Sequence, residues 1–180
     1  MIEPEVEYLA DASVTPEDDA ALRSLLSTCY SEPSASVFAR QRYYRDPHPH
    51  RWVIRDTAGV IVAHVGVPDR TVEHAGRTYR IGGIADVAVH PDYRRRGWMR
   101  RMLRDIHDWQ RERGFVFSVL FGADVIYGSS GYVRVENLWC DADEGAGEAR
   151  GNRIATSAMI KPLTDLPWPD GEIHLPGATF

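Results

Sequence analysis

The chain has 180 residues, of which 43% are hydrophobic and 26% charged, and its formal net charge at pH 7 is −5. This composition is typical of one globular domain spanning residues 1–180, and it excludes a disordered or fibrous chain. No stretch approaches the roughly 20 apolar residues of a membrane helix, and the acidic start lacks an export signal, so we expect a cytoplasmic protein that contacts no membrane.

Charge is unevenly distributed along the chain. Acidic residues dominate the first twenty positions and the 141–148 loop, whereas positions 94–104 contain six arginines. The negative total disfavours a nucleic-acid partner and suits a cationic substrate, while the arginine cluster indicates an anionic cofactor. Cys29 and Cys140 lie far apart, so we expect two free, buried thiols.

The first half of the chain predicts helices followed by a hairpin. Thr15, Pro16 and Asp18 form a capping-box pattern that begins a helix. The expected segments are a strand at 5–10, helices at about 16–30 and 34–44, and a hairpin of 51–56 and 59–72.

The second half of the chain predicts a strand–helix–strand arrangement. Residues 84–90 are apolar with little alternation, as in a strand buried on both faces. After Pro91 the apolar residues recur at helical spacing as far as Gly114. Further expected segments are strands at 115–121, 132–140 and 156–163, a short helix at 123–131 and a loop at 141–152. The order predicts a single α/β or α+β domain.

The turn between the buried strand and the helix has the chemistry of a phosphate site. The first N–H groups of a helix have no intrahelical partner and lie at the positive end of its dipole. Gly97 allows close approach of a diphosphate, and Arg94–Arg96 can neutralise it. The alternatives are solvated arginines on an amphipathic helix or a nucleic-acid patch. No G-x-G-x-x-G or P-loop pattern is present, which disfavours dinucleotide and nucleoside-triphosphate folds.

The stretch Arg94-Arg95-Arg96-Gly97-Trp98-Met99 resembles the Arg/Gln-x-x-Gly-x-Gly/Ala motif of the GNAT acetyltransferase superfamily. The resemblance implies acetyl-CoA as cosubstrate and no metal. It places the pyrophosphate at these six residues and the pantetheine along Val87, Ala88 and Val89. It also implies a central mixed, mostly antiparallel, twisted sheet of six to seven strands, flanked by about four helices and splayed between two central parallel strands. Met99 departs from the pattern, because a small residue is usual there.

Residues 123–132 are similar to a second family motif, Ala-x-x-x-Tyr followed by Gly-Phe. The resemblance implies that Tyr127 is the general acid that protonates the departing thiolate; the alternative is a structural tyrosine. Leu120 stands where the family usually has an asparagine. The oxyanion would be stabilised by the backbone N–H of Ala88 or Val89.

The general base is a choice among several residues. Asp86 is the one carboxylate on the apolar 84–89 strand, where a charge is costly unless it is used or paired. Its alternative role is structural, held by backbone or by an arginine. His64 and His90 have more suitable intrinsic pKa values. His48 and His50 resemble a metal-binding pair, but no third ligand lies near them in sequence.

The overall layout is similar to that of aminoglycoside 2′-N-acetyltransferases. This resemblance implies substrate contacts at Asp86, Ser118 and Phe180, with the terminal carboxylate as a second candidate base. We therefore expect a primary-amine N-acetyltransferase that uses direct attack in a ternary complex on a small molecule, with antibiotic resistance as one role and a homodimer as an open alternative. A protein or peptide amine as acceptor, and a catalytically silent acyl-CoA sensor, are the alternative functions.

Overall fold

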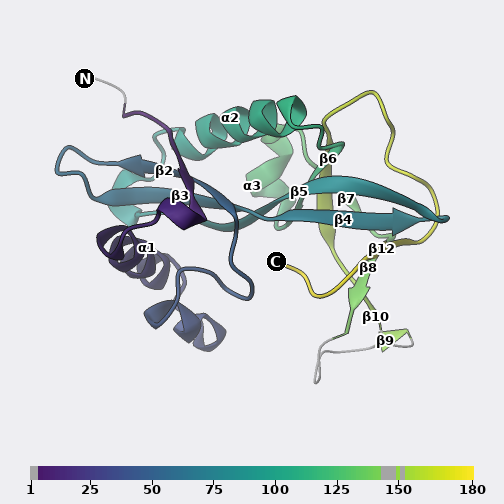
Figure 1. Cartoon of the computed structure of the whole chain (residues 1–180), viewed down its shortest axis with the longest axis horizontal. Coiled ribbons are helices and arrows are strands. Elements are labelled where there is room, and N and C mark those ends of the chain that lie inside the picture. The colour runs from purple at the N-terminus through teal and green to yellow at the C-terminus, as the bar shows by residue number, and fades with distance from the viewer. Residues whose placement is uncertain (1–3, 143–148, 151–152) are drawn as a thin grey trace. The chain divides into compact units, whose positions relative to one another are not determined.

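The structure is a computed structural model that describes residues 4–142, 149–150 and 153–180 (Figure 1). It divides into two compact units, one of residues 1–68 and 84–106 and the other of residues 69–83 and 107–180. Strand β5 (Arg77–Val89) and helix α2 (Trp98–Glu112) each begin in one unit and end in the other. Among the described residues, no helix is both long and apolar enough to cross a membrane. The single domain over residues 1–180 stays a prediction.

The first unit contains an antiparallel sheet, helix α1 and the first part of α2. The strand order is β1-β2-β3-β5, and α1 packs against β3 (Figure 1). Its further elements are β1 (Glu7–Ala10), η1 (Asp11–Ser13), α1 (Pro16–Cys29), η2 (Pro33–Ala39), β2 (His50–Arg55), β3 (Ile61–Val67) and η3 (Pro91–Tyr93).

Helix α1 begins as the sequence predicts. The Asp18 N–H donates to Thr15 Oγ1 over 3.1 Å, and the Thr15 N–H donates to Asp18 Oδ2 over 3.3 Å. These two bonds satisfy backbone groups that the first turn of a helix leaves unpaired. The helix buries Leu22, Leu25 and Leu26 in a core shared with the sheet. This apolar face fixes which side of α1 meets the strands.

The predicted second helix at 34–44 is wrong in type and length. The chain forms the 3-10 helix η2, which ends at Ala39. Beyond it, Arg42 forms ion pairs with the carboxylates of Asp11 and Asp19, with N–O distances of 2.9 Å to each. The Tyr44 N–H donates to the Asp86 carboxylate over 3.1 Å. Because this amide is used outside the segment, it cannot continue a helix.

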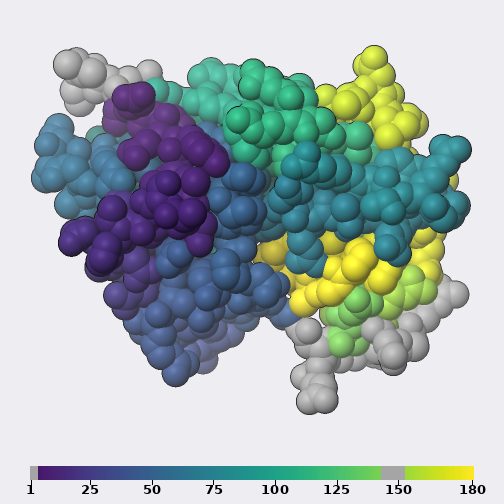
Figure 2. All heavy atoms as spheres, viewed as in Figure 1, coloured from purple at the N-terminus to yellow at the C-terminus, as the bar shows by residue number. Residues whose placement is uncertain are grey.

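The second unit contains most of the strands. The β4–β5 hairpin turns at Ala75 and Gly76, both with positive φ, and β12 pairs antiparallel to β4 and parallel to β8. Figure 2 shows the C-terminal segment lying between the β4 hairpin and the strands near residue 140. The elements are β4 (Asp69–His74), β6 (Phe117–Phe121), α3 (Asp124–Tyr127), η4 (Gly128–Ser130), β7 (Val133–Val135), β8 (Leu138–Asp141), β9 (Ala149–Arg150), β10 (Arg153–Ala155), β11 (Ala158–Pro162) and β12 (Ile173–Leu175).

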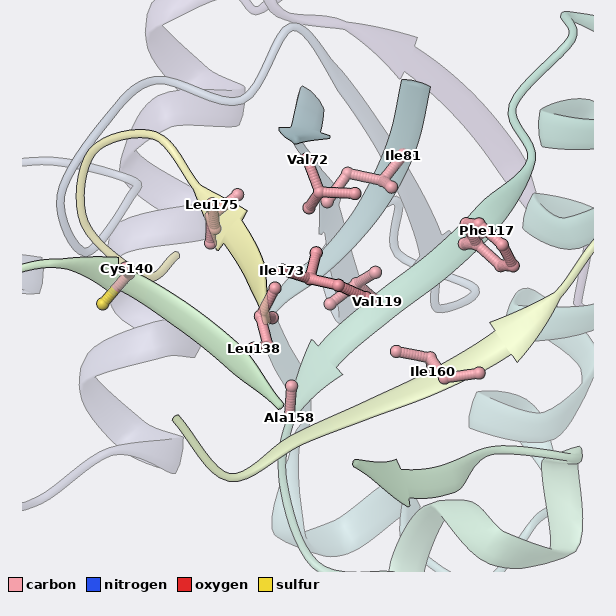
Figure 3. Close-up of a cluster of buried hydrophobic side chains, with 10 residues drawn as sticks. All are labelled: Val72, Ile81, Phe117, Val119, Leu138, Cys140, Ala158, Ile160, Ile173 and Leu175. Atoms are coloured by element: carbon pink, nitrogen blue, oxygen red, sulfur yellow. The ribbon is translucent and has the colours of Figure 1, made fainter. Parts of the chain in front are cut away.

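The core of the second unit is apolar and fully enclosed. Side chains from β4, β5, β6, β8, β11 and β12 meet in it (Figure 3). Phe117 is completely buried there, and the indole of Trp168 meets its ring edge-on at a centroid distance of 4.9 Å. This core supports β6 and β11, the strands next to the segment that contains Tyr127.

Three predicted segments differ in the structure. The strand predicted at 84–90 is the second half of a longer strand, β5, which begins at Arg77 and ends at Val89. The predicted strand at 132–140 is two strands with different partners: β7 pairs with β11, and β8 pairs with β10 and β12. The predicted 141–152 loop contains β9, which pairs with β10; its residues 143–148 and 151–152 lie outside the described part. These short strands raise the strand count above six to seven.

Candidate active site

The turn that precedes α2 has a run of unpartnered backbone amides. Arg95 and Gly97 both have left-handed backbones, with φ of 63° and 75°. The Arg94 N–H donates to the Pro91 carbonyl and the Arg101 N–H to the Gly97 carbonyl. Within the described residues, the five N–H groups of Arg95–Met99 between them have no acceptor. Alternating left-handed residues at a helix N-terminus direct such amides into one concave surface, which binds anions.

The three arginines of this turn are not equivalent. Arg94 Nε donates to the Val89 carbonyl over 3.1 Å, so its head group lies against β5. The Arg96 guanidinium lies 4.9 Å from the ring centroid of Tyr93, and Tyr93 stacks on the buried Trp98 at 5.4 Å. Arg95 is exposed, and its side chain has no partner in the described part of the chain. Arg95 is therefore the guanidinium most available to a ligand.

A groove of about 330 Å³ lies beside the start of this turn. It is bordered by α1, by the turn between β2 and β3, and by η3. Tyr93 lines it and donates its hydroxyl to Asp56 Oδ2 over 3.2 Å. The groove thus adjoins η3, directly before the turn, and its lining ends at Tyr93.

The end of β5 presents Val87 and Val89 on one edge. The His90 N–H donates to the Val62 carbonyl, and Ala88 pairs with His64, so these alternate residues form the ladder with β3. Val87 and Val89 consequently direct their N–H and C=O groups away from β3. On that edge the Val87 carbonyl accepts the Tyr30 hydroxyl over 2.7 Å, and the Val89 carbonyl accepts the half-buried thiol of Cys29 over 3.4 Å.

Asp86 occupies a bulge in β5. His64 pairs with Ala88 and Gly66 with Ala85, so β5 has one more residue than β3 between these pairs. Asp86 absorbs the difference with a left-handed backbone, φ 48°. Such a conformation is uncommon outside glycine, and Asp is one of the residues that tolerates it. The bulge reorients the residues on either side of it.

The carboxylate of Asp86 is held by partners from the segment before β2. His48 Nε2 lies 2.7 Å from Asp86 Oδ2, and both side chains are almost fully buried. The Tyr44 N–H is a second donor to the same oxygen. Oδ1 has no partner in the described residues, so one carboxylate oxygen stays available. A Cβ at Gly66 would overlap the His48 ring, so the absence of a side chain there makes room for this contact.

Two fully buried polar side chains flank this pair. His64 Nδ1 donates to the Asp86 main-chain carbonyl over 2.8 Å, and His64 Nε2 has no partner within the described chain. Burial, together with the positive charge of Arg51, lowers the pKa of His64 to about 3. Arg51 is completely buried and bonds to Asp11 and to the His48 carbonyl. A histidine that stays neutral down to this pH is a poor proton acceptor, which argues against His64 as base.

Tyr127 lies in the second unit, at the end of α3. Burial raises the pKa of its hydroxyl, so the group stays protonated at neutral pH. The hydroxyl has no hydrogen-bond partner in the described part of the structure, while the ring meets Tyr132 edge-on at 6.2 Å. A protonated phenol without an internal acceptor is free to donate to a ligand.

Ser118 belongs to a buried polar network. The Tyr132 hydroxyl lies 2.7 Å from Ser118 Oγ and 2.8 Å from His107 Nε2. Burial is the main reason that the pKa of His107 falls to about 3, and it raises the pKa of Tyr132. Because its hydroxyl is engaged internally, Ser118 has a structural partner, and its predicted substrate contact stays a prediction.

Phe180 and the remaining predicted positions are placed as follows. The Phe180 ring meets Phe121 edge-on at 5.2 Å and packs on the core of the second unit. His90 accepts the Asp92 N–H and thereby caps η3. Leu120 is buried in β6, opposite Met159. Among the described residues, no cluster of three or more His, Cys, Asp and Glu side chains could hold a metal ion.

The structure brings some predicted site residues together. Asp86, Val87–Val89 and Arg94–Met99 lie in the first unit, whereas Tyr127, Ser118 and Phe180 lie in the second. The partners of Asp86 were missed by sequence reasoning: Tyr44 and His48 are 42 and 38 positions away in the chain. No local pattern could have identified them, although His48 stood out as part of a histidine pair.

Comparisons with known proteins identify the family of the chain. Residues 12–135 match the sequence model described as "Acetyltransferase (GNAT) domain", which is well over half of the chain. The chain therefore belongs to the GNAT acetyltransferase family, and the predicted class of enzyme is confirmed. No curated protein sequence matches it.

Solved structures share the fold at low sequence identity. The GNAT family N-acetyltransferase YhbS from Escherichia coli, in complex with CoA, superposes with a TM-score of 0.69 at 18% identity, covering 97% of this chain and 92% of YhbS. A GNAT family acetyltransferase from Brucella melitensis, in complex with acetyl-CoA, gives 0.62 at 14% identity, with 95% and 96% covered. A chain of the NatC complex bound to Gag peptide and CoA gives 0.61 at 20% identity, with 89% and 99% covered.

These similarities confirm the predicted fold class, an α/β domain with a mixed sheet. The chain spans only about a third of three other similar structures, from Enterococcus faecalis, Anabaena variabilis and Kribbella flavida. The predicted splay between two central parallel strands stays a prediction.

His64 makes the stability of the fold depend on pH. The pKa of His64 is about 3 in the folded chain against 6.5 ordinarily, so the unfolded chain binds the proton more tightly. The resulting stabilisation is complete above about pH 6.5 and is lost as the pH falls toward 3. We expect His64→Gln to remove roughly 1.4 kcal/mol per pH unit from the slope of the unfolding free energy between about pH 6 and 4.

Urea unfolding at a series of pH values measures this slope. His107→Gln tests the same effect in the second unit, because the pKa of His107 is also lowered to about 3. An unchanged slope in His64→Gln would show that His64 takes up a proton as readily in the folded as in the unfolded chain.

Proposed function

We propose that the chain transfers an acetyl group from acetyl-CoA to a primary amine of a small molecule, by direct attack in a ternary complex. The observation that carries this proposal is the run of unpartnered amides over Arg95–Met99 at the start of α2. A diphosphate is a ligand of matching charge and hydrogen-bonding capacity. The CoA and acetyl-CoA in the complexes of the E. coli and Brucella proteins support the choice of cosubstrate.

The coenzyme would bind along two neighbouring segments of the first unit. Its pyrophosphate would accept hydrogen bonds from the N–H groups of Arg95–Met99. The exposed guanidinium of Arg95 would neutralise its charge. The pantetheine would follow the edge of β5 at Val87 and Val89, whose backbone groups face away from β3. Of the two candidate oxyanion donors, Ala88 is engaged in the ladder with His64, which favours Val89.

The proposed reaction requires two proton transfers and the stabilisation of one negatively charged oxygen. Asp86 would accept a proton from the attacking amine at Oδ1, the oxygen without a partner in the described residues. The N–H of Val89 would stabilise the oxygen of the tetrahedral intermediate. Tyr127 would donate its proton to the sulfur as the thiolate leaves. The terminal carboxylate at Phe180 is the alternative base.

The acceptor is the least constrained part of the proposal. The net charge of −5 favours a cationic amine such as a polyamine or an aminoglycoside. A peptide amine is the second candidate, because the structurally similar NatC complex is bound to a Gag peptide. A silent acyl-CoA sensor would bind the coenzyme without turnover.

A thiol-release assay with acetyl-CoA tests the proposed reaction. The acceptors should include aminoglycosides, polyamines, free amino acids and short peptides, and mass spectrometry should identify the acetylated product. Turnover with a small amine supports the proposal. Turnover with peptides alone makes the chain a peptide acetyltransferase, and saturable acetyl-CoA binding without turnover supports the sensor.

Gly97→Glu tests the pyrophosphate site. The substitution places a carboxylate beside the unpartnered amides, so we expect acetyl-CoA affinity to fall by at least about 100-fold, since repulsion and lost backbone contacts act together. Isothermal titration calorimetry measures the affinity. Gly76→Glu is the matched control, because Gly76 has φ 76° against 75° for Gly97, and both have open space around an added Cβ. Retained affinity in Gly97→Glu would place the coenzyme elsewhere.

Tyr127→Phe tests the general acid. We expect kcat to fall by roughly 10²–10⁴-fold with little change in acetyl-CoA affinity, because the hydroxyl matters as the sulfur departs. Steady-state kinetics and calorimetry separate the two effects. Tyr79→Phe is the control, since Tyr79 is a half-buried tyrosine that packs on Phe117. Equal kcat in wild type and Tyr127→Phe would remove Tyr127 from the mechanism.

Asp86→Asn tests the general base. The amide keeps an acceptor oxygen for Tyr44 and His48 but cannot take up a proton, so we expect kcat/KM to fall by about 10²-fold or more. The rate is measured across pH with the acceptor found above. Asp69→Asn, which alters an exposed ion pair with Arg80, is the control. An unaltered rate and pH profile would transfer the role to another group, such as the carboxylate at Phe180.

A further inference from the structure

The segment that contains Tyr127 has no apolar anchor of its own. Helix α3 has four residues, η4 has three, and neither buries a residue. Val125 in the middle of α3 is 93% exposed. A helix of one turn is not stable in isolation, because each hydrogen bond fixes several residues. The position of Tyr127 must therefore be set by contacts from outside the segment.

Arg134 supplies two such contacts from β7 and a third bond to the strands. Its Nη2 donates to the Gly122 carbonyl over 2.6 Å, and its Nε to Asp124 Oδ2 over 3.0 Å. Its Nη1 donates to the Ser157 carbonyl over 3.0 Å, at the residue before β11. The planar guanidinium thus joins the start of the Tyr127 segment to the strands of the second unit in a fixed geometry.

Lys161 holds the other end of the same segment. Its Nζ donates to the Ser130 carbonyl over 2.6 Å, from a position on β11 opposite Ser118. Arg134 and Lys161 together form what we call the carbonyl clamp, because three of their four bonds go to main-chain oxygens. The clamp grips the segment on both sides of Tyr127.

The residue that Arg134 holds is also the one against which the Tyr127 ring rests. A Cβ at Gly122 would lie 2.5 Å from Tyr127 Cε2, so the ring packs directly on the Gly122 backbone. The Tyr132 ring also contacts the Tyr127 ring edge-on. A shift of the Gly122 carbonyl consequently moves the surface on which the tyrosine ring lies.

We propose that Arg134 is a positioning residue for Tyr127, fixing the phenol through the Gly122 carbonyl, with Lys161 securing the far end of the segment. The kinetic part of this inference rests on the proposed role of Tyr127 as general acid. Its structural part, that Arg134 determines where the phenol lies, is independent of that role.

Fluorine NMR tests the structural part. The protein is labelled with 3-fluorotyrosine, and the Tyr127 signal is the one missing from Tyr127→Phe. In Arg134→Ala we expect this signal to shift and its pKa to fall, because the hydroxyl loses the burial that raises its pKa. Arg134→Lys should be intermediate, since lysine keeps the charge but not the fork geometry. Arg153→Ala, which breaks another half-exposed ion pair of the second unit, should leave the signal unchanged.

A double-mutant cycle tests the kinetic part with the acceptor found in the thiol-release assay. We expect Arg134→Ala to lower kcat by up to about 100-fold with little change in the KM for acetyl-CoA, as misplacement of a catalytic group does. In the Tyr127→Phe background the same substitution should have almost no further effect. Partial recovery of kcat in Arg134→Lys is the expected conservative rescue.

The outcomes separate the two proposals. An unmoved Tyr127 signal in Arg134→Ala and Arg134→Lys overturns the structural part of the inference. An equal loss of kcat with and without the Tyr127 hydroxyl overturns its kinetic part. If Tyr127→Phe itself leaves kcat unchanged, the assignment of Tyr127 as general acid is wrong. The NMR result then still tests whether Arg134 positions the Tyr127 ring. Should Arg134→Ala fail to fold, Arg134→Lys and Asp124→Ala, which removes one bond of the clamp, give the same test.

Discussion

One extra residue in β5 determines the arrangement of the first unit. The bulge opposite β3 places Asp86 in a left-handed conformation, and its carboxylate meets His48 and the Tyr44 amide. Beyond the bulge, the ladder with β3 continues through Ala88, so the backbone groups of Val87 and Val89 point to the other edge, where their carbonyls accept the Tyr30 hydroxyl and the Cys29 thiol. The bulge shifts the alternation of side chains and amides by one residue, so the residues on its two sides pair with β3 in different phase.

Local patterns in the sequence predicted local structure well. The capping box of α1, the arginine turn before α2 and the short helix containing Tyr127 each depend on residues within a few positions of one another. Long-range partners were out of reach. The predicted helix at 34–44 failed because Arg42 pairs with Asp11 and Asp19, and nothing in the segment itself indicates those contacts. Whether Asp86 would be free or held depended on a histidine 38 positions away.

The two candidate catalytic side chains are held by different physical means. Asp86 is enclosed, and its neighbours His48, His64 and Arg51 are buried polar groups whose desolvation must be offset by their mutual bonds. Tyr127 lies in a segment with almost no buried apolar surface, where polar bonds to the backbone replace packing. The first arrangement thus depends on buried polar groups, of which His64 and Arg51 keep unpaired nitrogens within the described chain, while the second depends on hydrogen bonds to the main chain.

The carbonyl clamp bonds mainly to main-chain oxygens, so the position of the short segment depends little on which side chains it carries. Gly122, Ser130 and Ser157 are held through oxygens that every amino acid possesses, so a change of side chain at Ser130 or Ser157 leaves the tethers intact. The outward side chains of α3, such as Val125, are likewise free of packing partners in the core. Side chains on the surface around the tyrosine can therefore change while the bonds that hold the segment stay in place.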